Sequence, residues 1–142
     1  MDNQTLIKFA LEAREYAYAP YSDFCVGAAL LTKDGKIFTG CNIENASYTP
    51  TNCAERTAFF KAISEGEREF SAIAVVGGQR GSVSGYAAPC GVCRQVMMEF
   101  CDPATFKVVV AISEQEYAEY TLEEMLPMGF GPKNLSQKNE KR

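Results

Sequence analysis

Apolar residues at helical spacing open the chain. Between residues 4 and 18 they recur every three or four positions, at Leu6, Ala10, Ala13 and Ala17. This period places them on one side of a helix. The proline at position 20 marks the end of the pattern, because proline cannot continue a helix. We therefore predict an amphipathic first helix over residues 4–18.

Continuous apolar runs rich in β-branched residues predict strands. They cover residues 24–32, 36–44, 71–78 and 105–112. The sequence Lys33-Asp34-Gly35 joins the first two and is typical of a β-hairpin. The last two show no polar alternation, as expected of strands covered on both faces. A helix between them implies a parallel pair, so the pattern predicts an α/β protein with helices packed on a mixed sheet.

Two further helices are expected in the middle of the chain. One runs from residue 53 to about residue 64, and either Thr51 or Asn52 could cap it. The other starts at Gly91. Its apolar side is predicted to consist of Val92, Val96, Met97 and Phe100.

A short last helix is expected over residues 121–126. Thr121 and Glu124 have the spacing of a capping box, in which each side chain binds the other residue's backbone N–H. The segment 77–89 is rich in glycine and polar residues and is predicted to be a loop. It contains neither of the glycine-rich patterns that bind phosphate, and no role is predicted for its side chains.

Composition limits the classes of function. The chain has 142 residues, 46% of them hydrophobic, which fits one globular domain over 1–136 followed by a disordered polar tail over 137–142. Its 18 acidic and 14 basic residues give a net charge of −4 with no basic cluster, which argues against a nucleic-acid partner. No apolar run reaches the roughly 20 residues that span a membrane. The first residues are typical of a helix, not a signal peptide, so we expect a cytoplasmic protein.

The chain has six cysteines and no histidine, so cysteines are the first candidates for metal binding or catalysis. In a reducing compartment, metal binding or catalysis is a more common use of cysteine than disulfides. Cys90 and Cys93 are three positions apart in a predicted helix, so both thiols can reach one ion. By itself this spacing also fits a redox pair or two core residues. The other cysteines at positions 25, 41 and 101 are expected to be small buried hydrophobic residues.

Cys53 is the candidate third ligand, because it also begins a predicted helix. A helix N-terminus favours the thiolate form that a metal needs, and three protein ligands are typical of a catalytic zinc site. Arg56, one turn into the helix, could donate hydrogen bonds to sulfur and withdraw charge. Glu55 could accept a proton from metal-bound water beyond the helix rim. Alone, Glu55 and Arg56 would be ordinary surface residues of a helix.

Together these residues resemble a known family. The tripeptide "CAE" at 53–55, followed by "PCGVCRQV" at 89–96, is similar to the homotetrameric zinc-dependent cytidine deaminases. The resemblance covers roughly residues 4 to 135. It includes the blocks "YAPYSDFCVGAALLT", "GCNIENASY" and "LPMGFGP". It implies a three-layer α/β/α sandwich with a mixed sheet of about five strands, one Zn²⁺ per subunit, and a homotetramer whose subunits share pockets.

The resemblance also implies an activity, the hydrolytic deamination of cytidine and deoxycytidine to uridine and deoxyuridine in pyrimidine salvage, with release of ammonia. The zinc ligands would be Cys53, Cys90 and Cys93. Glu55 would shuttle protons between zinc-activated water and the base, and Arg56 would support the sulfurs.

The same resemblance implies contacts to a nucleoside. Asn42 and Glu44 would bind the ribose hydroxyls, and Phe24 would pack against the pyrimidine. The residues implied in the remaining contacts are Ala54 and Ala88, through their main chain, and Tyr48 and Phe130, in a neighbouring subunit's pocket. The family often has a serine where this chain has Ala88, so only main-chain contacts could survive there.

The residues themselves leave simpler interpretations open. Phe24 and Phe130 could be core residues, and Tyr48 could be a turn residue. Asn42 and Glu44 could simply order a loop.

Three other functions also remain possible. A related aminohydrolase could act on another aminopyrimidine nucleoside such as blasticidin S. A non-catalytic zinc module would have no use for Glu55. A polynucleotide deaminase would fit the acidic composition poorly.

Overall fold

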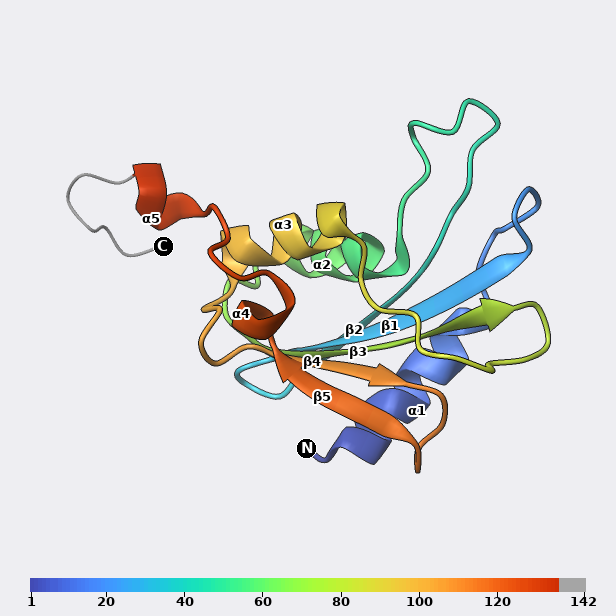
Figure 1. Ribbon diagram of the computed structural model, residues 1–142, viewed down its shortest axis with the longest axis horizontal. Helices are drawn as coiled ribbons and strands as arrows, with labels where there is room; N and C mark the ends of the chain where they lie inside the picture. The colour runs from blue at the N-terminus through green and yellow to red at the C-terminus, as the bar shows by residue number, and fades with distance from the viewer. Residues whose placement is uncertain (136–142) are drawn as a thin grey trace.

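The computed structural model describes residues 1–135 as a five-stranded sheet with helices on both faces (Figure 1). The expected tail, 137–142, lies outside the described residues. The strand order is β2-β1-β3-β4-β5. The strands are β1 (Phe24–Thr32), β2 (Ile37–Cys41), β3 (Phe70–Gln79), β4 (Lys107–Ala111) and β5 (Tyr117–Thr121). Only β3 and β4 pair in parallel, and the other neighbours are antiparallel, which confirms the mixed sheet.

The helices divide between the two faces of the sheet. In Figure 1, α1 (Asn3–Arg14) lies on one side, and α2 (Ala54–Ser64) and α3 (Gly91–Phe100) lie on the other. Short helices α4 (Leu122–Met125) and α5 (Pro132–Leu135) follow. One apolar core fills the space beneath α2 and α3, and a second packs against α1. This is the expected three-layer arrangement, and it explains why the central strands are apolar on both faces.

The first helix is shorter than its apolar pattern suggests. It ends at Arg14, four residues before the predicted end. Beyond it, the backbone N–H of Tyr18 donates to Asn42 O (2.9 Å), and the N–H of Glu44 donates to Tyr18 O (2.9 Å). These long-range main-chain bonds pull the chain out of the helix before Pro20 is reached. Tertiary pairing therefore overrides a local helical pattern here.

Strand β5 and helix α5 were not predicted from the residue pattern. β5 is an edge strand with one neighbour and half-exposed side chains, so it lacks the continuous apolar run that marks β3 and β4. Its two tyrosines and its threonine, residue types that favour strands, were the available signal. The capping box at α4 is confirmed, because Glu124 N donates to Thr121 Oγ1 (3.2 Å) and Thr121 N donates to Glu124 Oε1 (2.8 Å).

Two details of the central helices differ from expectation. Val92 was predicted to lie on the apolar side of α3, but it is 57% exposed. Met97 is buried as predicted, and Cys93 is the other buried residue of this helix. Neither Thr51 nor Asn52 caps α2. Cys53 is the N-cap residue and no side chain accepts from the first turn. Among the described residues, no helix is long and apolar enough to cross a membrane.

Candidate metal centre and active site

Three of the six cysteines converge on the face covered by α2 and α3. Cys53 is the N-cap residue of α2, and Cys90 is the N-cap residue of α3. Cys93 lies one turn further into α3 and is buried. Their sulfur atoms all lie within 4.8 Å of one another. Two helix N-termini, from segments 37 residues apart, thus bring the predicted ligands together.

The spacing of the sulfurs fits a zinc ion. Cys53 Sγ and Cys90 Sγ are 3.8 Å apart, and Cys90 Sγ and Cys93 Sγ are 3.6 Å apart. A tetrahedral centre with Zn–S bonds of about 2.3 Å separates its sulfurs by about 3.8 Å. The cysteines outside the cluster are not near enough to complete a four-sulfur site among the described residues. The donor set is therefore three thiols with one vertex left for another ligand, as in catalytic zinc sites.

The electrostatics of the cluster favour a bound cation. A hydrogen bond from the Cys93 thiol, together with Arg56, lowers the pKa of Cys53 to about 5 although burial opposes this. The same hydrogen bond raises the pKa of Cys93. One thiolate therefore forms easily, and the repulsion between neighbouring thiolates resists a second. A divalent ion removes this repulsion. In addition, neither helix N-terminus has a side-chain cap, so both dipoles act on the sulfurs.

Arg56 contacts the cluster as predicted. Its Nη2 donates to Cys53 Sγ at 3.2 Å, one turn along α2. Its Nε is buried and has no hydrogen-bond partner among the described residues. A guanidinium beside three sulfurs offsets the negative charge that they would place on one ion.

Glu55 is buried beside the cluster, with 4% of its surface exposed. Burial raises the pKa of its carboxyl group to about 7, and the negative charge of Cys53 acts in the same direction. A carboxylate with a pKa near neutrality can both accept and return a proton. An ordinary helix glutamate would be exposed to solvent and would have no such property.

The two residues predicted to bind ribose make hydrogen bonds to other residues of the chain. Asn42 Oδ1 accepts from Val26 N (2.9 Å), and its Nδ2 donates to Phe24 O (2.8 Å). Glu44 accepts from Tyr21 N (2.9 Å) and from the Ser22 backbone and hydroxyl. Glu44 thus orders the segment before β1, and Asn42 orders the first residues of β1.

The other predicted contact residues are largely exposed. Phe24 is 38% exposed at the start of β1, and Phe130 and Tyr48 are more exposed still, so none of them is a core residue. Tyr48 also has a positive φ of 66°, which is rare for tyrosine. Ala54 is buried in the first turn of α2, and Ala88 is exposed just before Pro89. Their roles toward a nucleoside stay predictions.

Sequence reasoning missed an arginine that secures a ligand. Arg94 Nε donates to Pro89 O (2.7 Å), and its Nη1 donates to Met125 O (2.6 Å). It therefore fixes the residue that precedes Cys90 against the end of α4. Its position four residues after Cys90 was the only signal, since that is one helical turn.

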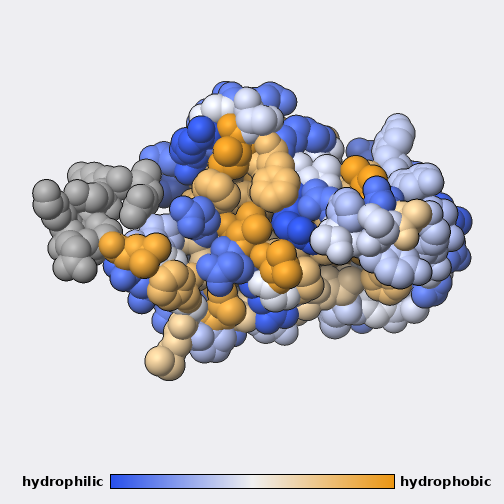
Figure 2. All heavy atoms as spheres, turned by 90° about the horizontal axis from the view of Figure 1, so that it is seen from above, coloured by the Kyte–Doolittle hydropathy of each residue, from blue (hydrophilic) through white to orange (hydrophobic). Residues whose placement is uncertain are grey.

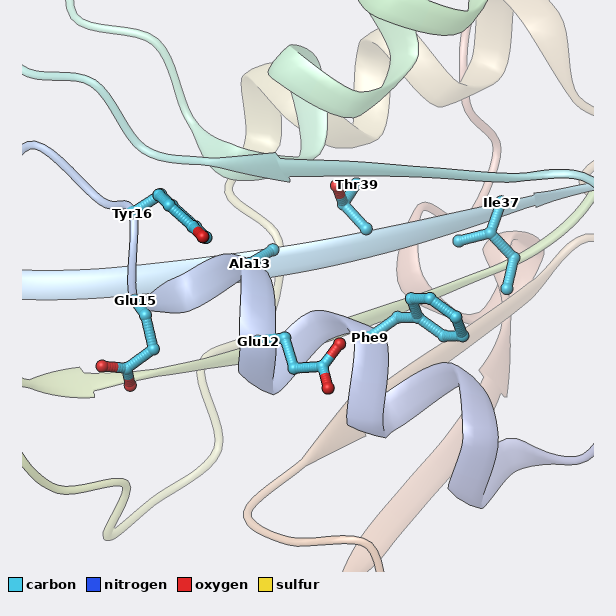
Figure 3. A pocket seen from close by; sticks show the side chains of 7 residues that line it. All are labelled: Phe9, Glu12, Ala13, Glu15, Tyr16, Ile37 and Thr39. Carbon is cyan, nitrogen blue, oxygen red and sulfur yellow. The ribbon is translucent and has the colours of Figure 1, made fainter.

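A groove of about 600 Å³ lies elsewhere, between α1 and β2. Figure 3 shows Glu12, Glu15 and Tyr16 at its α1 side and Thr39 and Ile37 on β2. No cysteine lines it, and its carboxylates point away from one another in this view. It is therefore distinct from the sulfur cluster, which lies on the other face of the sheet.

Comparisons with known proteins agree with this geometry. Residues 1–112 match the family model for the cytidine and deoxycytidylate deaminase zinc-binding region. A cytidine deaminase of Halalkalibacterium halodurans is 54% identical over 136 residues, covering 96% of this chain and 99% of that protein. A probable cytidine deaminase of Dictyostelium discoideum is 43% identical, covering 94% and 87%.

A solved structure gives the same result. The crystal structure of cytidine deaminase from Burkholderia pseudomallei superimposes with a TM-score of 0.83 at 52% identity, covering 92% of this chain and 100% of that one. Sequence, fold and the three-cysteine centre thus agree, and this chain belongs to the cytidine and deoxycytidylate deaminase family.

Proposed function

We propose that this protein hydrolyses the amino group from cytidine and deoxycytidine, giving uridine or deoxyuridine and ammonia. The observation that carries this proposal is a buried carboxylate, Glu55, beside three thiols that leave one metal vertex open. The Halalkalibacterium and Burkholderia relatives, both named cytidine deaminases, support the choice of substrate. A purely structural zinc site would need no carboxylate at this position.

The metal ligands would be Cys53, Cys90 and Cys93. A zinc ion held there supplies the Lewis acidity that makes water nucleophilic at neutral pH. Arg56 keeps the sulfurs from donating too much charge, through its contact with Cys53 Sγ.

Glu55 moves the protons. Its carboxylate takes a proton from the attacking water and delivers it to ring N3. The oxygen of that water bonds to C4 at the same time. Glu55 then moves the remaining proton of this oxygen to the amino nitrogen, the C4–N bond breaks, ammonia leaves, and the oxygen stays on C4 as the carbonyl group of the product. A pKa of about 7 suits both directions of transfer, and the buried setting keeps bulk water away from the carboxylate.

The substrate pocket would be formed by the first residue of β1, by residues that follow β2, and by the main chain at the start of α2 and before α3. Phe24 presents part of its ring to solvent, as a surface for a pyrimidine requires. Asn42 and Glu44 order the backbone around it and would turn toward the ribose hydroxyls. The main chain at Ala54 and Ala88 would read the edge of the base.

We also propose a homotetramer with pockets shared between subunits. Figure 2 views the face covered by α2 and α3 and shows hydrophobic side chains gathered across its middle. Exposed apolar residues on these elements and the C-terminal segment include Phe60, Val92, Phe130 and Leu135. A patch of this kind is typical of an interface. Tyr48 and Phe130 would reach the pocket of a neighbour. A cytoplasmic location remains a prediction.

Substitution of Glu55 tests the proposed function. Glu55→Gln should retain fold and zinc but release ammonia from cytidine at least about 100-fold more slowly, because the proton shuttle is lost. Absorbance change and ammonia release measure the rate, and elemental analysis measures the metal. Glu99→Gln is the matched control, since Glu99 is an exposed glutamate of α3.

Undiminished ammonia release by zinc-loaded Glu55→Gln would contradict the assignment. Parallel assays with blasticidin S and with single-stranded DNA identify the substrate class. Faster turnover of either one than of cytidine would overturn the proposed substrate.

A further inference from the structure

The loop 79–88, which joins β3 to α3, borders the site at both ends. It begins where Gln79 pairs with Phe24 at the edge of the β1–β3 ladder. It ends at Pro89, directly before the ligand Cys90. Whatever fixes this loop therefore also fixes the surroundings of the Phe24 ring.

A buried arginine of α1 holds the start of the loop. Arg14 is 7% exposed and has no carboxylate within salt-bridge distance among residues 1–135. Its Nε and Nη2 instead donate to four main-chain carbonyls. The acceptors are Cys25 O, Gly78 O, Gln79 O and Ser82 O, at 2.9, 3.0, 2.6 and 2.8 Å. A buried cation satisfied only by carbonyls fixes the path of the backbone.

Two consecutive glycines let the loop contact both faces of β3. A Cβ on Gly78 would lie 2.5 Å from Ser82 O, so the start of the loop covers the α1 side. A Cβ on Gly77 would lie 2.8 Å from Ala87 Cβ and 3.2 Å from Phe24 Cε2, so its end covers the catalytic side. Successive residues of a strand face opposite ways. The loop therefore covers both faces of β3 at its end and lies beside the Phe24 ring.

A second contact joins the loop to the segment before β1. Arg80 Nε pairs with Asp23 Oδ1 at 2.8 Å, and Arg80 N donates to Asp23 O at 2.9 Å. Asp23 directly precedes Phe24. The ligand Cys90 has a support of its own, because Arg94 Nε donates to the carbonyl of the preceding residue, Pro89, at 2.7 Å.

We propose that Arg14 is a positioning residue for the nucleoside pocket: it fixes the 79–88 loop around β3, and the loop holds Phe24 where the base binds. This inference rests on the proposed function. It assigns Arg14 to substrate binding and not to the proton transfers, because Glu55 and the sulfurs are held by α2, α3 and Arg94.

Arg14→Lys tests the proposal, since lysine keeps the charge but cannot serve acceptors from both Nε and Nη2. We expect KM for cytidine to rise about tenfold while kcat stays within about threefold and zinc content is unchanged. Arg68→Lys is the matched control. Arg68 also donates to two backbone carbonyls, those of Ile63 and Glu67, but away from the site. The Arg68→Lys variant should therefore have the KM of the wild type.

A second variant disturbs the loop and leaves Arg14 unchanged. Gly78→Ala pushes a methyl group against Ser82 O and should also raise KM with little change in kcat. Hydrogen exchange gives a readout that needs no activity. The amides of Arg80 and Ser82, bonded to Asp23 O and Gln79 O, should be protected in the wild type and exchange at least about tenfold faster in both variants.

Four results would overturn the proposal: an unchanged KM in either folded variant, a fall in kcat or zinc with KM unchanged, unprotected amides in the wild type, or unaltered exchange in the variants. The exchange of the wild type can be read even if neither variant folds. If the wild-type protein does not deaminate cytidine but the exchange results are as expected, the proposed function is wrong, whereas the role of Arg14 in fixing the 79–88 loop is still supported. If wild-type activity depends on Glu55 but Arg14→Lys leaves KM for cytidine unchanged, only the role proposed for Arg14 is wrong.

Discussion

Two charged residues of α2 owe their chemistry to their surroundings. Glu55 is a carboxyl group whose burial raises its pKa to about 7. Arg56 is a guanidinium that donates to a sulfur instead of to a carboxylate. Both are common residue types whose neighbours give them a specific role. Their effects can therefore be measured by single substitutions that keep size and shape.

The buried carboxyl group should make the metal-free protein less stable at high pH. A folded-state pKa of about 7 against an ordinary 4.5 means that the folded state resists ionisation, so stability falls as pH rises from about 4.5 to 7. Glu55→Gln should remove this cost, by up to about 3 kcal/mol at pH 8, with no gain below pH 4.5. Urea unfolding of chelator-treated, reduced protein at fixed concentration measures this. An equal gain at both pH values would contradict it.

Arg56 should affect rate more than binding. With Arg56→Gln the sulfurs keep more negative charge, so the zinc becomes a weaker Lewis acid, and kcat should fall about tenfold with KM nearly unchanged. Arg56→Lys, which keeps a positive donor, should lose less. Steady-state kinetics on samples of equal zinc content make the comparison. An unchanged kcat with metal retained would rule out this role for Arg56.

At the scale of elements, the site depends on how two helix N-termini meet. Cys53 and Cys90 occupy the N-cap positions of α2 and α3, where a serine or aspartate would ordinarily cap the helix. Helix α2 is placed by its contacts with the sheet. α2 packs on β2 and β1, and Gly40 of β2 lies directly beneath its first turn.

Gly40→Ala should therefore disturb the metal centre from below. Its Cβ would lie 2.4 Å from Ala54 O and 2.6 Å from Ala58 N, both backbone atoms of α2 that cannot move independently. We expect weaker zinc binding, by at least about tenfold, and a stability loss of about 1–3 kcal/mol from overpacking. Zinc titration with a competing chelator and urea unfolding measure the two effects. Wild-type zinc affinity in this variant would show that α2 tolerates the shift.

At the scale of the molecule, we propose that the apolar face over α2 and α3 is the interface of the tetramer. Figure 2 shows exposed hydrophobic side chains on this face, and the three clustered cysteines belong to the helices that cover it. In the proposed tetramer, a neighbouring subunit would cover this face and complete the substrate pocket. Assembly and activity should therefore be lost together.

A charge on this face should break the proposed tetramer. Phe60 is 49% exposed on α2, and Phe60→Asp would bury a carboxylate at the interface, which is costly. We expect dimers or monomers in sedimentation velocity, with activity reduced in proportion. Tyr16→Asp is the control, because Tyr16 is 81% exposed beside the α1 groove on the other face. A tetrameric Phe60→Asp protein, or a monomeric wild type, would contradict the assembly.

Local signals determined much of this protein. The hairpin turn, the β-branched runs of β3 and β4 and the capping box of α4 are short-range patterns, and each gave the element it predicted. The spacing of Cys53, Glu55, Cys90 and Cys93 indicated a zinc site with a base, because ligand type and spacing limit what a metal can bind. The turn, the strands and the capping box depend on covalent geometry and on nearby residues. The zinc-site pattern joins two local pieces that lie 37 positions apart in the chain.

Only the tertiary structure decided features that depend on distant segments. α1 ends early because Tyr18 pairs with residues more than 20 positions away, and β5 is a strand because β4 lies beside it. Arg14 looks like one more helix arginine until folding surrounds it with four carbonyls from three segments. Burial and long-range hydrogen bonds are created by packing, and no local pattern encodes them. The sequence by itself therefore specified the ligands, whereas the packed chain specified what surrounds and orients them.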